Sequence, residues 1–184
     1  MEYFFYCRDR DGVGDLRWRL VEEHWSFMDD YADGMIARGP TFVPGRDAPT
    51  GSVHIVDLPD AEAARVFAFE EPNYRAGVYG EVLVRRFVNM AGRTMWEFPE
   101  RSGTDERFLI LAHAEPGVAR NDAIKEADED RLIVWGPLLS EDGEQWVGTA
   151  ILGEFPDEQS ARDAVDADAY GSVEVHHWQF GGRR

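Results

Sequence analysis

Two short segments of the chain are apolar at nearly every position, namely YFFYC (residues 3–7) and FLILA (residues 108–112). A strand with one face in water alternates between apolar and polar residues, and neither segment does so. We therefore expect two strands that are covered on both faces. Helices would cover one face, and a second layer of apolar sheet would have to cover the other.

The order of predicted elements occurs twice along the chain. Each copy predicts strand, helix, strand, strand, helix and strand. Gly39-Pro40 lies 97 positions before Gly136-Pro137, and Pro59-Asp60 lies the same distance before Pro156-Asp157. The acidic residue after each of the latter prolines suits the first turn of a helix, where N–H groups are free and the helix dipole is positive. We interpret the chain as a tandem duplication.

This order of elements is that of a ferredoxin-like unit. The fold class that we predict is α+β, with two ferredoxin-like βαββαβ repeats packed sheet to sheet as a pseudo-dimeric α+β barrel within one chain. The expected boundaries are residues 1–88 for the first repeat, 89–106 for a linker and 107–184 for the second repeat.

Two further expectations concern the borders of these repeats. The linker contains Met95, Trp96 and Phe98, so it should pack against a domain because such side chains are costly to leave in water. The last strands, VLVRRF (82–87) and VEVHHW (173–178), alternate more visibly and should face solvent at one edge. Such an edge could also pair with another chain. The sequence thus allows a monomer with an internal pseudo-dimer or a homodimer.

Net charge and cysteine content exclude several classes of function. The 184 residues carry 19 basic and 36 acidic side chains, and the net charge of −17 repels nucleic acid and anionic membranes. The single cysteine can form neither a disulfide within the chain nor a cysteine-based metal cluster. The sequence has neither a basic, apolar leader nor about 18 consecutive apolar residues. We expect a cytoplasmic protein whose partner is a small-molecule ligand or substrate, without nucleic acid or membrane.

His24 is the first candidate for chemistry. At about 100° per residue, it falls inside the apolar arc of the first predicted helix. A histidine in such an arc is either a core residue with satisfied ring nitrogens or a pocket residue whose neutral imidazole accepts a proton. The sequence by itself leaves both readings open. The other members of the arc are Leu20, Val21, Trp25, Met28, Ala32 and Met35.

The segment EHWSFMDDYADGMIARGP (23–40), followed by FEEPNYRAGVYGEVLVRRF (69–87), resembles the YCII-related domain family. The resemblance covers the first half of the chain well and the second half more loosely, through Gly136-Pro137 and Asp168-Ala169-Tyr170. No single motif is specific, and the order and spacing of the motifs support the resemblance. In the first half they are His24, Gly39-Pro40, Glu71-Pro72 with Tyr74, and Ala76-Gly77.

The resemblance implies a dimeric α+β barrel with a pocket beside the histidine and a His–carboxylate pair suited to acid–base chemistry. Glu71 stands at the acidic position of the family, where Asp is usual, and its longer side chain puts the geometry of the pair in question. Asp33 and Glu70 are alternative partners for His24. The resemblance also implies a pocket role for Tyr74, as hydrogen-bond donor to an oxyanion or phenolate.

The candidate site therefore comprises His24 and Glu71 as catalytic residues and Tyr74, Arg17 and Asp33 as substrate-binding residues. Arg17 precedes the histidine by more than the family's usual spacing, so it is a weaker clamp for an anionic substrate. The second repeat has no histidine in its short acidic helix, expected over residues 119–130, so we expect at most one His-based site per chain.

The remaining histidines do not predict a metal or cofactor site. His176 and His177 are neighbours on a strand, so their side chains leave opposite faces and cannot share an ion. His54 and His113 are isolated on predicted strands. The segment GVGD (12–15) lacks the third glycine and the lysine of a phosphate-binding loop. We expect no cofactor.

Three functions follow from these expectations. The first is a cofactor-free lyase, isomerase or dehydrochlorinase that acts on a small cyclic or phenolic molecule through His24 and Glu71. The resemblance supports it, because relatives include an enzyme that removes chloride from a chlorinated hydroxyquinol. The second is a module that binds a small molecule or partner without turnover. The third is an oxygenase, since the fold is shared with small monooxygenases. Function inferred from a shared fold is analogy, and the site must carry it.

Overall fold

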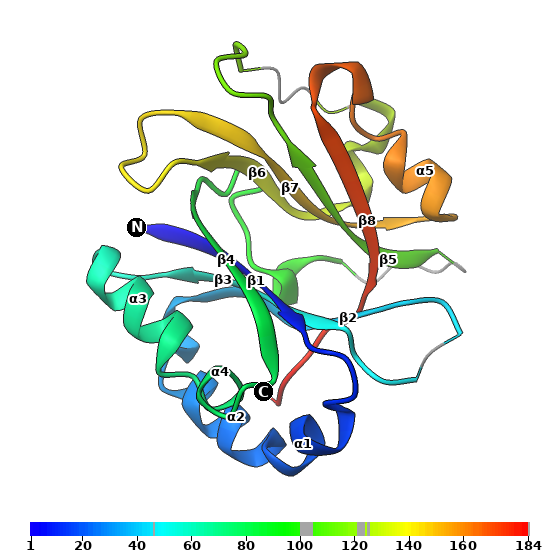
Figure 1. The fold of residues 1–184 in the computed structure, drawn as a ribbon. Helices are drawn as coiled ribbons and strands as arrows, with labels where there is room; N and C mark the ends of the chain where they lie inside the picture. Colours follow the sequence, from blue (N-terminus) through cyan, green and yellow to red (C-terminus); the bar gives the residue numbers. More distant parts are fainter. Residues whose placement is uncertain (46, 100–104, 121–123, 125, 184) are drawn as a thin grey trace.

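The computed structural model describes residues 1–45, 47–99, 105–120, 124 and 126–183 of the chain. In this part of the chain eight strands close into one antiparallel barrel (Figure 1). The expected α+β class is confirmed. The strands are β1 (Glu2–Asp9), β2 (Met35–Phe42), β3 (Gly51–Asp57), β4 (Tyr79–Phe87), β5 (Glu106–His113), β6 (Leu132–Leu139), β7 (Trp146–Phe155) and β8 (Ser172–Trp178).

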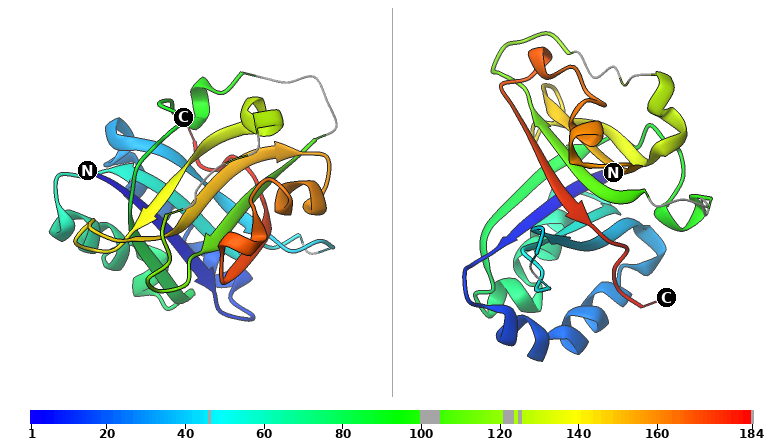
Figure 2. Two further views of the ribbon diagram at one scale, coloured as in Figure 1. Left: turned by 90° about the horizontal axis from the view of Figure 1, so that it is seen from above. Right: turned by 90° about the vertical axis from the view of Figure 1, so that its right-hand side faces the viewer.

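The α-helices lie outside the barrel, as the two further views in Figure 2 show. None of the helices in the described part of the chain exceeds nine residues, far below the length needed to span a lipid bilayer. The α-helices are α1 (Gly14–Arg19), α2 (Val21–Asp29), α3 (Ala61–Phe69), α4 (Pro72–Arg75) and α5 (Glu158–Arg162). The 3₁₀ turns are η1 (Ala32–Gly34), η2 (Met95–Glu97), η3 (Glu126–Arg131) and η4 (Ala167–Ala169).

The barrel order is β1-β3-β2-β8-β5-β7-β6-β4. The first four strands of the chain thus lie in the order β4-β1-β3-β2, and the last four in the order β8-β5-β7-β6. Two seams join these groups, β2 with β8 and β4 with β6. The expectation that β4 and β8 face solvent at an edge is wrong, because each pairs with a strand on both sides.

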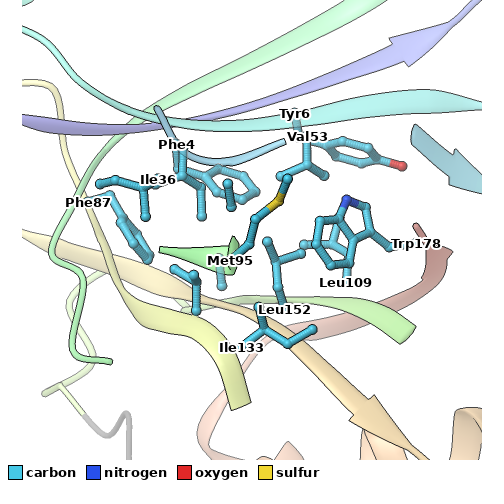
Figure 3. Close-up of a cluster of buried hydrophobic side chains, with 14 of the residues drawn as sticks. Phe4, Tyr6, Ile36, Val53, Phe87, Met95, Leu109, Ile133, Leu152 and Trp178 are labelled. Carbon is cyan, nitrogen blue, oxygen red and sulfur yellow. The ribbon is translucent and has the colours of Figure 1, made fainter. Parts of the chain in front are cut away.

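Strand β1 is covered on both faces, as its apolar sequence predicts. Phe4 and Tyr6 point into the barrel, where side chains from both halves of the chain form one core (Figure 3). Tyr3 and Phe5 point outward and pack with Phe67 of α3 in a second core. Burial of large apolar side chains on both faces of the same strand is the main stabilising contribution here.

The segment between β4 and β5 packs into the barrel. Met95 is 1% exposed and lies among the interior side chains of Figure 3, and Phe98 belongs to the same core. The expected packing of the linker is therefore confirmed for its described part, whereas residues 100–104 lie outside the described residues. The same holds for residues 121–123 and 125 of the helix expected over 119–130, whose end forms η3.

The first predicted helix is shorter than its apolar arc. It divides into α1 and α2 and ends at Asp29, so Ala32 lies in η1 and Met35 begins β2. Asp29 ends α2 and its last turn holds no basic residue, so no positive charge there complements the helix dipole. Gly34 then passes so close to the carbonyl of Asp57 that a side chain would clash there.

The repeated Gly-Pro pairs mark the two seams of the barrel. A Cβ atom on Gly39 of β2 would overlap the carbonyl of Gln179, just beyond β8. A Cβ atom on Gly136 of β6 would overlap the carbonyl of Val88, just beyond β4. At each seam the chain that leaves the last strand of one half runs directly over a glycine of the other half. The Gly-Pro spacing therefore reflects closure of the barrel.

Replacement of Gly136 by Ala should weaken the seam between β4 and β6, because neither backbone can move away without breaking the barrel pairing. We expect the free energy of unfolding, measured in urea, to fall by about 1–3 kcal/mol relative to the wild type. Gly14→Ala is the matched control, since a Cβ atom there meets only Ala48 at an ordinary 3.8 Å. Equal stability of the two variants would contradict this account of the seam.

Candidate functional site

A cavity of about 740 Å³ lies between the helices α1 and α2 and the outer face of β2 and β3. This volume suits a small organic ligand. Its walls are largely apolar and aromatic, with Trp18, Val21, Trp25, Met28, Phe42 and Phe180 among the lining residues. The polar part of the lining consists of Asp15, Arg17, His24, Arg38, Asp47, Ser52, His54 and Asn73.

The floor of the cavity is formed by cross-strand pairs. Arg38 of β2 lies opposite His54 of β3, and Pro40 lies opposite Ser52. Directly opposed residues of an antiparallel pair share one face of the sheet. Because Val53 and Ile55 point into the barrel, Ser52 and His54 point outward toward the helices.

His24 and Glu71 meet at the wall of this cavity. His24 Nδ1 lies 2.5 Å from Glu71 Oε1, and the two side chains are 13% and 3% exposed. Glu71 also caps the N-terminus of α4, where its Oε2 accepts a hydrogen bond of 2.9 Å from the backbone N–H of Tyr74. Pro72 at the first helical position fixes the start of α4. Both carboxylate oxygens of Glu71 are thus held in place.

The pairing fixes which nitrogen of His24 is available. Nδ1 is engaged by Glu71, and no other hydrogen bond to the His24 ring occurs within the described part of the chain. Nε2 is therefore the ring nitrogen left for a ligand, since His24 lines the cavity. The extra methylene of Glu relative to Asp does not prevent the contact. Glu70 pairs with Arg75 at the surface instead.

Two predicted substrate-binding residues lie outside the cavity. Tyr74 is 39% exposed, and its ring packs edge-on against Phe69 at 4.9 Å between centroids. The single turn of α4 directs its side chain to the surface, so only its backbone N–H serves the site. Asp33 is exposed in η1, because α2 ends before it, and it does not line the cavity. Neither residue lines the cavity, so the site proposed below uses neither side chain for substrate binding.

Arg17 does line the cavity, but its charge is already paired. Its Nη1 lies 2.7 Å from Asp9 Oδ1, and its Nη2 donates to Ser52 Oγ at 2.6 Å. Asp9 is 4% exposed, and burial raises the pKa of Asp9 to about 6, although the neighbouring Arg17 acts in the opposite direction. Arg17, in the last turn of α1, thus ties this helix to the sheet.

His54 is the site residue that the sequence analysis missed. It is 3% exposed and lines the cavity, and its ring centroid lies 5.7 Å from that of His24. Burial, followed by the charges of His24, Arg17 and Arg38, lowers the pKa of His54 well below its ordinary value. The ring is therefore neutral. The alternation of SVHIV, with His54 on the face opposite to Val53 and Ile55, is the signal that could have found it.

Among the described residues no group of three or more His, Cys, Asp or Glu side chains is arranged to hold a metal ion. His176 lies against Tyr6 inside the barrel and His177 against Phe108 outside it, as expected for neighbours on a strand. Cys7 is buried, and burial raises the pKa of its thiol, which disfavours the thiolate form.

The pKa of Asp9 generates a testable pH dependence. Because the pKa is higher in the folded state than in the unfolded state, the folded protein binds more protons between about pH 4 and 6. The contribution of Asp9 to the free energy of unfolding should therefore fall as the pH rises through this range, by up to about 3 kcal/mol. Urea unfolding of the wild type and Asp9→Asn at several pH values measures the difference. If the wild type instead gains stability relative to Asp9→Asn as the pH rises, the ion pair with Arg17 outweighs burial in setting the pKa of Asp9.

Comparisons with known proteins agree with this architecture. No protein of curated function matches the sequence. A mutant chlorite dismutase from Candidatus Nitrospira defluvii is 10% identical, with a TM-score of 0.57 over 97% of this chain and 91% of that chain. This likeness shows the fold.

Two further structures are less similar. A putative monooxygenase from Lactobacillus acidophilus NCFM is 8% identical, with a TM-score of 0.49 over 97% of this chain and 92% of that chain. A 5-chloro-2-hydroxyhydroquinone dehydrochlorinase from Burkholderia phenoliruptrix AC1100 is 22% identical, with a TM-score of 0.47 over 50% of this chain and 99% of that chain. The family model of the YCII-related domain matches residues 1–88. The matched residues carry both His24 and Glu71.

Proposed function

We propose that the protein is an enzyme of the lyase or isomerase type, which moves a proton on a small cyclic or phenolic molecule bound in the cavity. His24 is the acid–base residue and Glu71 its orienting partner. The supporting observation is the contact of 2.5 Å between His24 Nδ1 and a carboxylate whose second oxygen caps α4. A histidine oriented in this way, beside a ligand-sized cavity, has the arrangement needed for general acid–base catalysis.

The pair would work as follows. To act as a base, the His24 ring donates Nδ1–H to Glu71 and offers the lone pair of Nε2 to an acidic proton of the substrate. The carboxylate stabilises the imidazolium that forms, and the fixed ring returns the proton from Nε2 to a different substrate atom. In an elimination, the substrate instead expels a leaving group as an anion after losing its proton. Either sequence needs only an oriented imidazole and a substrate with an acidic C–H or O–H bond.

We also propose that the chain consists of two ferredoxin-like copies, residues 1–88 and 107–184, joined by residues 89–106. The equal strand order of the two groups and the matching glycines at the two seams support this proposal. In the second copy, Tyr170 lies in the stretch that corresponds to Tyr74 of the first. Tyr170 packs in a core, and its hydroxyl donates a hydrogen bond to Thr149. Only the first copy would carry acid–base chemistry.

Turnover by the wild type should be sought among cyclic lactones and hydroxylated or chlorinated phenols. On any substrate found, His24→Gln should lower kcat by about 10²–10⁴-fold, because the proton acceptor is lost. Glu71→Gln should lower kcat less, since it removes the charge that stabilises the imidazolium. Steady-state kinetics measures both changes, with circular dichroism to verify that each variant is folded.

Tyr74→Phe is the matched control, because the Tyr74 hydroxyl has no hydrogen bond within the described residues and its ring lies outside the cavity. It should leave kcat unchanged. Turnover that survives His24→Gln would overturn the assignment of the acid–base residue. Binding of these molecules without turnover would overturn the proposal that the protein is an enzyme.

A further inference from the structure

Three buried polar atoms around the cavity have no hydrogen-bond partner within the described residues. They are Nε of Arg38, Nδ1 of His54 and Oδ1 of Asn73. Their side chains are 6%, 3% and 1% exposed, and all three residues line the cavity. Buried polar atoms in folded proteins nearly always have partners. Three orphaned atoms around one cavity therefore point to the polar groups of a ligand.

Arg38 carries a buried positive charge without a counter-ion. Within the described part of the chain no carboxylate lies within ion-pairing distance of its guanidinium, whereas Arg17 is paired with Asp9. Its Nη2 donates to the carbonyl of Arg183, and its guanidinium lies 5.8 Å from the ring centroid of Trp96. Burial lowers the pKa of Arg38, and the charges of Asp29 and Arg183 act on it in opposite directions. An unpaired buried charge is costly, so an anionic group on a ligand would be strongly favoured here.

His54 lies beside Arg38 as its cross-strand neighbour. Because its ring is neutral, it can donate one hydrogen bond without adding charge. Asn73 adds an amide oxygen that can accept from a hydroxyl, while its Nδ2 donates to Tyr79 at 3.3 Å. The acidic residues of the lining, Asp15 and Asp47, are exposed, so they disfavour an anion at the outer end of the cavity.

We propose that Arg38 and His54 bind an oxyanion of the substrate, with Asn73 as an additional hydrogen-bond acceptor, so that the cavity selects small organic anions of the carboxylate or enolate type. The apolar body of the ligand then packs against the aromatic walls contributed by Trp25 and Phe42. This inference rests on the proposed function in that it names the substrate class of the same site. It assigns recognition to the sheet and proton transfer to the helix that carries His24.

Benzoate and benzamide are the probes, since they share shape and size but differ in charge. Isothermal titration at pH 7.5 and constant low salt should show that the wild type binds benzoate at least tenfold more tightly than benzamide. Arg38→Gln should abolish this preference by weakening benzoate alone, and His54→Asn should reduce it. Arg65→Gln is the matched control, because Arg65 is a surface arginine of α3 beside a separate hollow. It should leave both affinities unchanged.

Arg38→Lys serves in case the Gln variant does not fold, which circular dichroism will reveal. It keeps the charge but loses the planar guanidinium, so it should retain a reduced preference for benzoate. Equal affinity of the wild type for the two probes, binding of neither, or an undiminished preference for benzoate in either Arg38 variant would overturn the proposal.

Failure of this inference and failure of the proposed function are distinguishable. His24→Gln should bind benzoate within about threefold of the wild type, because recognition lies at the floor of the cavity. If benzoate is preferred but no substrate is turned over, anion recognition stands and the enzyme assignment falls. If turnover depends on His24 but benzoate and benzamide bind alike, the enzyme assignment stands and Arg38 is not the recognition residue.

Discussion

Closure of the barrel is the constraint on which the rest of the structure depends. The interior core takes side chains from both halves, and it stays dry only while β2 pairs with β8 and β4 with β6. Those seams are short, and each needs a glycine over which the departing chain can pass. The helices then cover the outer face of a sheet whose inner face is already buried. The cavity exists because this outer covering is incomplete between α2 and β2.

The carboxylate of Glu71 joins the architecture of the site to its chemistry. One oxygen accepts a hydrogen bond from a free backbone N–H at the N-terminus of α4, and the other orients the imidazole of His24 on α2. A side chain with both oxygens committed has little freedom left, so the ring that it holds is positioned before any ligand arrives. Such preorganisation is what acid–base catalysis requires of its supporting residues.

The sequence predicted the features that follow from local chemistry. Continuous apolar runs predicted strands buried on both faces, and the apolar arc around His24 predicted its inward direction. The family resemblance, through Glu71-Pro72, implied a carboxylate partner for it, with Asp33 and Glu70 as alternatives. Features set by tertiary placement were not predictable. Tyr74 packs against Phe69 at the surface, and α2 ends at Asp29, which leaves Asp33 in the exposed turn η1. In the sequence His54 is an ordinary strand residue, and only the packing of α2 on the sheet makes it part of the site.

The C-terminal segment brings residues of the second half of the chain into the wall of the cavity. Phe180, Gly181 and Gly182 form one wall of the cavity, and Arg183 reaches Glu22 and Asp29 of α2. The backbone of this segment lies so close to β2 that side chains on either glycine would clash there. The second half of the chain thus forms part of the cavity that His24 of the first half lines. Ligand preference can therefore diverge through changes near residue 180 while the acid–base pair, more than a hundred residues away in the chain, remains untouched.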